Sequence, residues 1–266
     1  MEKEVIESEL VDLRLNGGPF AFKNLSAGQV TAGIRARAGE KAYLIDQAGT
    51  SLCGPACFMY WVASDMPRVY AKYIQDLFRT GKGRIGDLTV EPSTSCKNFD
   101  PQVDSGDLEV PHPTDWIALA SLRDSSNLFR AYDEVDDEVA GITMPRTLQS
   151  WFKRAGYRDS VNTTIKKNRR GDVYSHQRLE DLKEASRLVQ SGYRVNLLID
   201  GKMLNGNQGS SWLPNHWVAL LAPVDFRKTF GGSSLDAQIY TWGRKRRFTT
   251  SVDVFLGNFW GLVAAR

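Results

Sequence analysis

Three side chains of this sequence have the types and the spacing for amide chemistry: Gln47, Cys53 and His216. At Cys53 a run of small turn residues changes abruptly into a bulky apolar run, which predicts a loop leading into a buried helix over residues 53–63. Pro55 fits the first turn of that helix, where its missing N–H costs nothing. Cys53 is therefore expected at a helix N-terminus, where partial positive charge stabilises a thiolate.

The surroundings of Cys53 also offer hydrogen-bond donors. Backbone N–H groups at a helix start can receive the oxyanion that develops when an amide carbonyl is attacked. Gln47, upstream of Cys53, offers its side-chain amide for the same role. Cys57, one helical turn further on, is expected to be a small core residue. The alternative for Cys53 is also that of a small core residue, because a single cysteine at a helix start is usually a buried small side chain.

His216 has the sequence context of a catalytic base, because it stands at the head of an apolar strand predicted over residues 216–221. A neutral imidazole near Cys53 would take the thiol proton and return it to the leaving amine. The alternative is a core histidine bonded to the backbone. His112, between two prolines, is expected in a surface loop. His176 is expected to be exposed or part of a cap, near the start of a helix predicted over residues 176–190.

The motif Gln47-x5-Cys53-Gly54-Pro55-Ala56 resembles the start of papain-like cysteine peptidases, above all the double-glycine leader peptidases and the papain-like bacterial effector toxins. The strand that begins His216-Trp217-Val218 resembles the histidine strand of the same group. The resemblance implies an α+β fold in which an N-terminal nucleophile helix packs on a C-terminal antiparallel sheet. It also implies a cysteine peptidase with Cys53 and His216 as the catalytic pair and Gln47 as an oxyanion donor.

In the family, a third residue, Asn or Asp, orients the histidine from the neighbouring strand. Here Tyr240-Thr241-Trp242-Gly243 occupies the comparable place, and it offers neither a carboxylate nor an amide. Two ways of aligning the family pattern select Tyr240 or Thr241, and Thr241 is the residue that we predict. Further candidates stay open: Asp225, Asp236 and Gln238.

The order of the predicted elements, helices first and strands last, fits the implied fold over residues 42–266. Residues 1–40 are predicted to be an N-terminal arm, and residues 41–266 a papain-like peptidase domain in which residues 81–175 form a helical insertion. Residues 81–113 within it are expected to be loop-like. Helices are predicted over 68–78, over 114–125 with Thr114 as N-cap, and after a capping Thr143; strands are predicted over 42–46, 194–199, 237–242, 251–255 and 259–264.

With 266 residues, 42% hydrophobic and 24% charged, the chain has the composition of a soluble globular protein. Its net charge of +3 is too small to argue for a nucleic-acid partner. No run reaches the roughly 18 apolar residues that a membrane span needs. No Cys/His cluster has zinc spacing, so neither a metal nor another cofactor is expected. The acidic cluster 133–138 and the basic run 166–170 are interpreted as solvated loops, and Gly17-Gly18 as a turn.

The N-terminus lacks the features of a secretory signal peptide. Together with the resemblance, this predicts an effector toxin that is cytoplasmic in its producer and is delivered into the cytoplasm of a target cell. There it would cleave a protein substrate, and its producer would need a cognate immunity protein. The alternatives are a papain-like amidase acting on peptidoglycan, a glutamine deamidase, and a catalytically dead binding module.

Overall fold

The computed structural model describes residues 19–101, 103–104, 109–130, 142–164, 175–206, 213–229 and 232–266; of residues 127–130, 175–177 and 229 it describes the backbone alone. Four predicted features lie outside this part of the chain: Gly17-Gly18, the acidic cluster 133–138, the basic run 166–170 and the side chain of His176. The chain divides into two compact units. Unit 1 comprises Met1–Thr143, Arg154–Gly156 and Trp242–Arg244, and unit 2 comprises Met144–Lys153, Tyr157–Thr241 and Lys245–Arg266.

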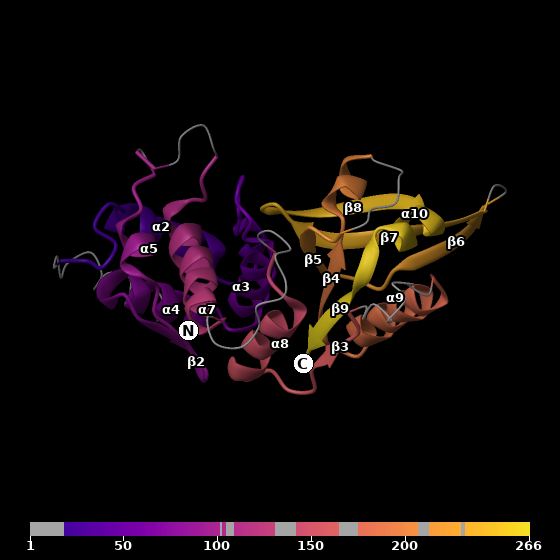
Figure 1. Cartoon of the computed structure of the whole chain (residues 1–266), viewed down its shortest axis with the longest axis horizontal. Coiled ribbons are helices and arrows are strands. Elements are labelled where there is room, and N and C mark those ends of the chain that lie inside the picture. The colour runs from indigo at the N-terminus through magenta and orange to yellow at the C-terminus, as the bar shows by residue number, and fades with distance from the viewer. Residues whose placement is uncertain are drawn as a thin grey trace. The chain divides into compact units, whose positions relative to one another are not determined.

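Unit 1 is built mainly from helices, of which α2, α3, α4, α5 and α7 are labelled in Figure 1. Its helix α3 (Cys53–Asp65) is buried at every position from Cys53 to Ala63, which is the pattern of a helix enclosed by other elements. Helix α4 (Pro67–Thr80) follows directly and buries one face, since it is amphipathic; Pro67 begins it and Gly81, at φ +74°, ends it. The remaining elements of this unit are α2 (Ala27–Arg37), η1 (Ala42–Leu44), β1 (Gly83–Ile85), β2 (Leu88–Val90), α5 (Thr94–Asn98), α6 (Pro113–Asp115), η2 (Trp116–Ala120) and α7 (Ser121–Arg130).

Elements α6, η2 and α7 form one continuous helical run in which the middle segment is π-helical. The predicted helix over 114–125 is thus confirmed, but the prediction that Thr114 caps it is wrong. The N-cap is His112, whose Nδ1 accepts a hydrogen bond from the Thr114 N–H at 3.3 Å. Pro113 occupies the first helical position, which suits its fixed φ, so the cap lies two residues before the predicted Thr114.

Unit 2 contains a seven-stranded sheet with the order β3-β9-β4-β5-β7-β6, in which β8 pairs with β7. Its strands pair antiparallel. The strands are β3 (Val161–Asn162), β4 (Arg194–Ile199), β5 (His216–Leu220), β6 (Asp225–Thr229), β7 (Gly232–Thr241), β8 (Arg244–Ser251) and β9 (Phe259–Ala265). Strands β4, β5 and β9 are almost continuously buried, so they form the centre of the unit.

The other elements of unit 2 are helical: α8 (Pro145–Arg154), α9 (Ser175–Gln190), η3 (Gly201–Asn205) and α10 (Val252–Gly257). Helix α9 packs on strands β4 and β9, beside which it lies in Figure 1, and buries Leu182, Ala185 and Leu188. The fold prediction is therefore confirmed as α+β with helices and a large antiparallel sheet. Its papain-like part stays a prediction.

Two predicted strands are wrong. Residues 42–46 contain a 3₁₀ turn instead, with hydrogen bonds from Ala42 N to Gly39 O and from Ile45 N to Ala42 O. A short apolar run has no period that separates a strand from a turn. Residues 251–255 enter helix α10, because Ser251 accepts a hydrogen bond from the Val254 N–H at 3.1 Å. Ser251 and Asp253 together are an N-cap signature that the strand prediction overlooked.

Other predictions are confirmed in outline. The helices over 53–63, 68–78 and 176–190 and the strands over 194–199, 216–221, 237–242 and 259–264 all form, with ends that differ by a few residues. The helix after Thr143 begins at Pro145, which puts Met144 rather than Thr143 at its N-cap position. The segment 81–113 is not only loop, since it contains the β1–β2 hairpin and α5.

The boundary predicted at residue 40 does not separate the two units, since both of its sides belong to unit 1. Helix α2 of the predicted arm buries Val30 and Ile34 and contacts α6. The prediction of one peptidase domain over 41–266, with an insertion over 81–175, stays a prediction. Among the helices of the described residues, none combines the length and the apolar character that crossing a membrane requires.

Candidate functional site

Cys53 is the first residue of helix α3, as the sequence predicts. The residue before it, Leu52, has no side-chain group that could cap the helix, so the first backbone N–H groups are not taken by an N-cap side chain. Pro55 lies within the first turn, where it removes an N–H that would have no partner inside the helix. The side chain of Cys53 lies in the core and is 3% exposed. Its sulfur thus lies at the positive end of a buried helix.

The other two cysteines are poor nucleophiles. Burial raises the pKa of the Cys57 thiol well above its ordinary value, and the charge of Cys53 adds to the effect. Burial, with a smaller contribution from Asp124, raises the pKa of Cys96 to about 12. Both thiols are therefore protonated at neutral pH, and none of the three cysteines forms a disulfide. Cys53 is thus distinguished by its position at the start of α3.

Gln47 lies in a tight turn upstream of α3. Its side-chain Nε2 donates to the Thr50 carbonyl at 2.6 Å, and the Thr50 hydroxyl donates back to the Gln47 carbonyl at 2.5 Å. Gln47 is nearly buried, at 8% exposure. Its amide nitrogen has two N–H bonds, and the contact with Thr50 uses one. The turn therefore fixes the amide that the sequence suggests as an oxyanion donor.

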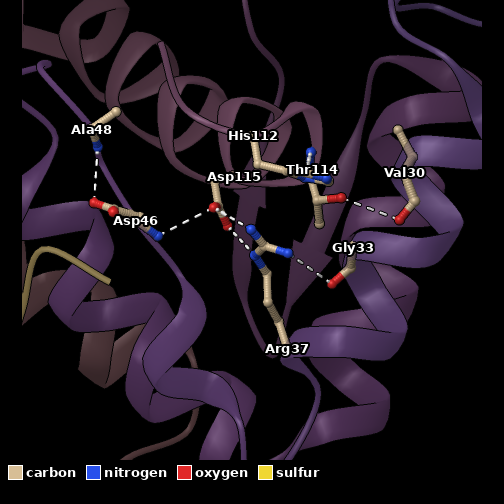
Figure 2. A network of polar contacts seen from close by, with 8 residues as sticks. All are labelled: Val30, Gly33, Arg37, Asp46, Ala48, His112, Thr114 and Asp115. Atoms are coloured by element: carbon tan, nitrogen blue, oxygen red, sulfur yellow. Dashed lines mark hydrogen bonds and ion pairs between the residues drawn. The ribbon is translucent and has the colours of Figure 1, made fainter. Parts of the chain in front are cut away.

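A buried ion pair is hydrogen-bonded to Asp46, the residue before Gln47 (Figure 2). Arg37, at the end of α2, donates to both carboxylate oxygens of Asp115 at 2.7 and 2.9 Å. Asp115 also accepts from the Asp46 backbone N–H at 3.1 Å, and Asp46 in turn accepts from the Ala48 N–H at 2.9 Å. Burial raises the pKa of Asp115 to about 6 although Arg37 lowers it, so the carboxylate is ionised at neutral pH. The pair thus anchors the residue next to Gln47.

His112 lies beside this network as well, and it is not the surface loop residue that the sequence suggests. Burial, with the nearby Arg37 charge as a smaller cause, lowers the pKa of His112 to about 4. The imidazole is therefore neutral at neutral pH, which leaves Nδ1 able to accept the hydrogen bond from the Thr114 N–H. Its role is to cap a helix.

In unit 2, His216 is the first residue of β5, and its Nε2 shares a hydrogen bond of 2.6 Å with the hydroxyl of Thr241 at the end of β7. Strand register explains the contact. Ala219 pairs with Tyr240, and continuing this register places Thr241 opposite Val218. His216 is then the diagonal neighbour of Thr241 on the same face of the sheet. Both side chains are buried, at 5% and 2% exposure.

The other candidates for the third residue are placed differently. Tyr240 is adjacent to Thr241 on an extended strand, so its side chain points to the opposite face. Asp236 binds Arg247, Arg227 and Thr249, and Asp225 binds Arg227. Gln238 is exposed. Thr241 is thus the candidate whose contact with His216 the structure describes.

Burial lowers the pKa of His216 to about 4, and the charge of Asp200 opposes this by raising it. At neutral pH the imidazole is neutral and can act as a base. Asp200 was missed in the sequence, although it directly follows β4, whose last residue Ile199 pairs with His216. The sequence signal for Asp200 is a carboxylate that directly follows an apolar strand.

Asp200 is held by its neighbours. Its Oδ1 accepts from Asn215 Nδ2 at 2.8 Å and from the Lys202 N–H at 2.9 Å, while Asn215 Oδ1 accepts from the Gly201 N–H at 2.7 Å. Gly201 lies so close to His216 that a Cβ there would come within 3.2 Å of the His216 Cβ. Asn215, directly before His216, is a second residue that the sequence interpretation missed. These contacts fix the backbone on both sides of the imidazole.

The structure therefore describes two half-sites, each within its own unit. Gln47 and Cys53 lie on the turn and helix start of unit 1, and His216 and Thr241 lie on neighbouring strands of unit 2. The pairing of Cys53 with His216 stays a prediction. Among the described residues, no group of His, Cys, Asp and Glu side chains has an arrangement suited to a metal ion.

Comparisons with known proteins add no family to this description. No protein-family model matches the chain. A search of curated protein sequences finds none with significant similarity. The two half-sites must therefore be interpreted through their own chemistry.

Proposed function

We propose that the protein is a cysteine peptidase of the papain-like type, in which the Cys53 thiol and the His216 imidazole act as a pair. The observation that carries the proposal is the hydrogen bond between His216 Nε2 and Thr241, because it orients a neutral, buried imidazole from the neighbouring strand. The position of Cys53 at the start of α3 supports the assignment of the nucleophile.

In the proposed reaction, His216 takes the proton of the Cys53 thiol, and the thiolate attacks a peptide carbonyl. Since Nε2 faces Thr241, the proton would be handled by Nδ1. The tetrahedral oxyanion would be held by the Cys53 N–H and the second N–H of Gln47. Collapse breaks the C–N bond, and His216 returns its proton to the leaving amine. Water then hydrolyses the thioester with His216 as the base, releasing the acid and restoring the thiol.

The sharpest test compares variants of two cysteines, of which only Cys53 is proposed to be the nucleophile. A bacterial lysate is incubated with the wild type, Cys53→Ala, Cys57→Ala or His216→Ala, and new protein N-termini are identified by mass spectrometry. We expect new termini with the wild type and with Cys57→Ala, and none with Cys53→Ala or His216→Ala. Cys57 is the matched control, because it is a buried thiol one helical turn away on the same helix. Cleavage that survives in Cys53→Ala overturns the proposal.

The same samples separate the alternative chemistries. A peptidoglycan amidase would change muropeptides and leave proteins intact, and a deamidase would convert a glutamine side chain without cutting the backbone. A binding module would depend on neither Cys53 nor His216. Peptidase action is preferred because the motif around Cys53 resembles that of peptidases, which cut backbone amides.

The cellular role is part of the proposal and rests on the resemblance. The protein would act as an effector toxin, made in the cytoplasm of one cell and delivered into another, and its producer would carry an immunity protein. Expression of the wild type inside a bacterial cell should then stop growth, whereas Cys53→Ala should be tolerated at the same expression level. Equal toxicity of the two would contradict the role.

A further inference from the structure

Strand β8 ends the sheet of unit 2 on one side, and from Lys245 onward it belongs to that unit. Among the described strands it pairs with β7 alone, beside which it runs in Figure 1. Strands β5 and β6 pair with successive parts of β7, so they share the other side of that strand. With 8 residues and no proline, β8 is long for an edge strand, since edges are usually kept short or interrupted. The outer side of β8 is therefore a long sheet edge.

We propose that this edge binds an extended acidic segment of a partner protein, which adds to the sheet as a further strand beside β8. Main-chain hydrogen bonds to the edge would give affinity, and the charges of β8 would select an acidic partner. The inference goes beyond the proposed function and does not depend on it, because it concerns a surface that has no part in the proposed cleavage.

The backbone groups that face outward on β8 follow from the contacts of its neighbours. The Leu221 N–H donates to the Gln238 carbonyl at 2.8 Å, so the backbone groups of Gln238 point toward the β5 side and away from β8. The Thr249 hydroxyl bonds the Asp236 carboxylate across the two strands, and this register places Arg247 opposite Gln238. The N–H and C=O groups of Arg247 and Thr249 consequently point outward, because alternate residues of a strand bond to opposite sides. No backbone partner for these outward groups is found in the part of the chain that the structure describes.

This side of the sheet carries more positive than negative charge. Its carboxylates are Asp225 and Asp236, and both bind Arg227 of β6, at 2.8 and 2.7 Å. Asp236 also binds Arg247 of β8 at 2.9 Å. The basic side chains that unit 2 contributes to β6 and β8 outnumber these acids: Arg227, Lys228, Lys245, Arg246 and Arg247. An acidic chain is therefore attracted to the edge, whereas a second copy of β8 would be repelled.

The alternation of β8 indicates which side chains the partner would carry. Lys245, Arg247 and Thr249 point to the exposed face of the sheet. Phe248 points to the other face, where it stacks on Phe255 with ring centroids 6.1 Å apart. Residues directly opposite each other on paired strands share a face of the sheet. A strand beside β8 would thus alternate acidic residues, which face Lys245 and Arg247, with apolar residues, which face Phe248.

A peptide titration of the wild-type full chain tests the proposal. The probe is a peptide of about seven residues that alternates glutamate with valine and has blocked ends, and the backbone amide signals of the protein are followed by NMR. We expect the signals of Arg247 and Thr249 to shift. The same peptide with lysine in place of glutamate should bind about tenfold more weakly or not at all. If about 1 mM of the glutamate peptide shifts no signal along β8, the proposal is overturned, and the basic residues only keep the edge from pairing with itself.

Two methylated peptides distinguish strand addition from the simple attraction of an anion. The peptide residue opposite Arg247 is a glutamate whose N–H points at β8, whereas the N–H groups of the valines point away. N-methylation of the inner glutamates should therefore weaken binding about tenfold or more, and N-methylation of the valines should change it by less than about threefold. Both methylated peptides keep the charge of the parent. If the two bind equally well, strand addition is overturned and the surface attracts anions in general.

A charge variant tests whether the peptide binds at β8. Lys245→Gln with Arg247→Gln should weaken binding of the glutamate peptide about three- to tenfold. The matched control is Lys183→Gln with Arg187→Gln, which removes the same two types of side chain from the exposed side of α9 and should leave binding unchanged. Urea unfolding of both double variants shows whether each is folded. A folded Lys245→Gln, Arg247→Gln protein that binds the peptide as the wild type does overturns the assignment to β8. None of these outcomes depends on cleavage, so the proposed function holds or fails separately.

Discussion

Replacing Thr241 by valine removes the hydroxyl that lies 2.6 Å from His216 Nε2. Valine has nearly the shape of threonine, so the change acts mainly on the hydrogen bond. Both side chains are almost fully buried, so water does not readily take over the missing partner. In Thr241→Val, Nε2 therefore faces a methyl group. The imidazole loses the contact that fixes its orientation and its tautomer.

The loss of reactivity in Thr241→Val should be large because the hydrogen bond between His216 and Thr241 is strongest once His216 is protonated. Transfer of the thiol proton makes His216 an imidazolium, which donates from both ring nitrogens. A hydrogen bond to a charged group is worth about 1.5–3 kcal/mol. Each 1.36 kcal/mol is a factor of ten in rate, so the activated pair should be weakened by about 10- to 150-fold.

The assay needs no knowledge of the substrate. The rate of alkylation of the Cys53 thiol by iodoacetamide is measured by mass spectrometry from about pH 5 to pH 8, the range in which thiolate–imidazole pairs and thiols differ most. The control is Thr31→Val, which removes an equally buried hydroxyl that donates to the Ala27 carbonyl at 2.7 Å. We expect alkylation to slow by about tenfold or more in Thr241→Val and to change by less than about twofold in Thr31→Val.

The free energy of unfolding of both variants is measured alongside, so that a loss of folded protein is not mistaken for a loss of reactivity. A folded Thr241→Val protein whose Cys53 reacts at the wild-type rate over the whole pH range would refute the reasoning. Thr241 would then be a structural neighbour of His216 and no part of a reactive pair.

Three further perturbations have outcomes that the structure fixes. Burial lowers the pKa of His216 from 6.5 to about 4, so between these pH values the folded state binds fewer protons than the unfolded state. The free energy of unfolding should therefore fall by about 3 kcal/mol from pH 6.5 to pH 4. Urea unfolding of His216→Phe should show a shallower fall over the same range. Asp200→Asn removes the charge that raises the pKa of His216, so NMR titration should find that pKa lower still; a rise would contradict the assignment. Asp115→Ala leaves Arg37 buried without its carboxylate and should cost about 3–5 kcal/mol of stability, whereas Arg37→Met with Asp115→Leu should cost clearly less than Asp115→Ala alone, both measured by urea unfolding.

Much of the framework could be predicted from the sequence because its signals are local. The abrupt change at Cys53 and the proline two residues later specify a buried helix start, and the apolar run after His216 specifies a strand. Thr241 was selected by position along a motif, and the register between β5 and β7 brings its hydroxyl to the imidazole. These elements were predictable because periodicity and capping act over a few residues.

The rest depends on contacts between residues that are distant in the chain. Arg37 and Asp115 are 78 positions apart, and no pattern in the sequence connects them. Asp200 comes near His216 only because β4 and β5 pair with Ile199 opposite His216. Strands β6 and β8 were missed because their residues are polar and mostly exposed, so they have no apolar run. Tertiary pairing decides such features, and a single sequence does not display it.

The buried Arg37–Asp115 pair is better explained by the turn that it holds in place than by a contribution to stability. Removing two charges from water costs several kcal/mol per ion, so such a pair is weak evidence for stability, and an apolar pair of similar volume is often as stable or more so. What an apolar pair cannot supply is an acceptor for the Asp46 N–H, which Asp115 holds at 3.1 Å. Asp46 precedes Gln47, and its carboxylate fixes Ala48 at a positive φ of 50°. The ion pair is therefore best explained as the anchor of the turn that carries the proposed oxyanion donor.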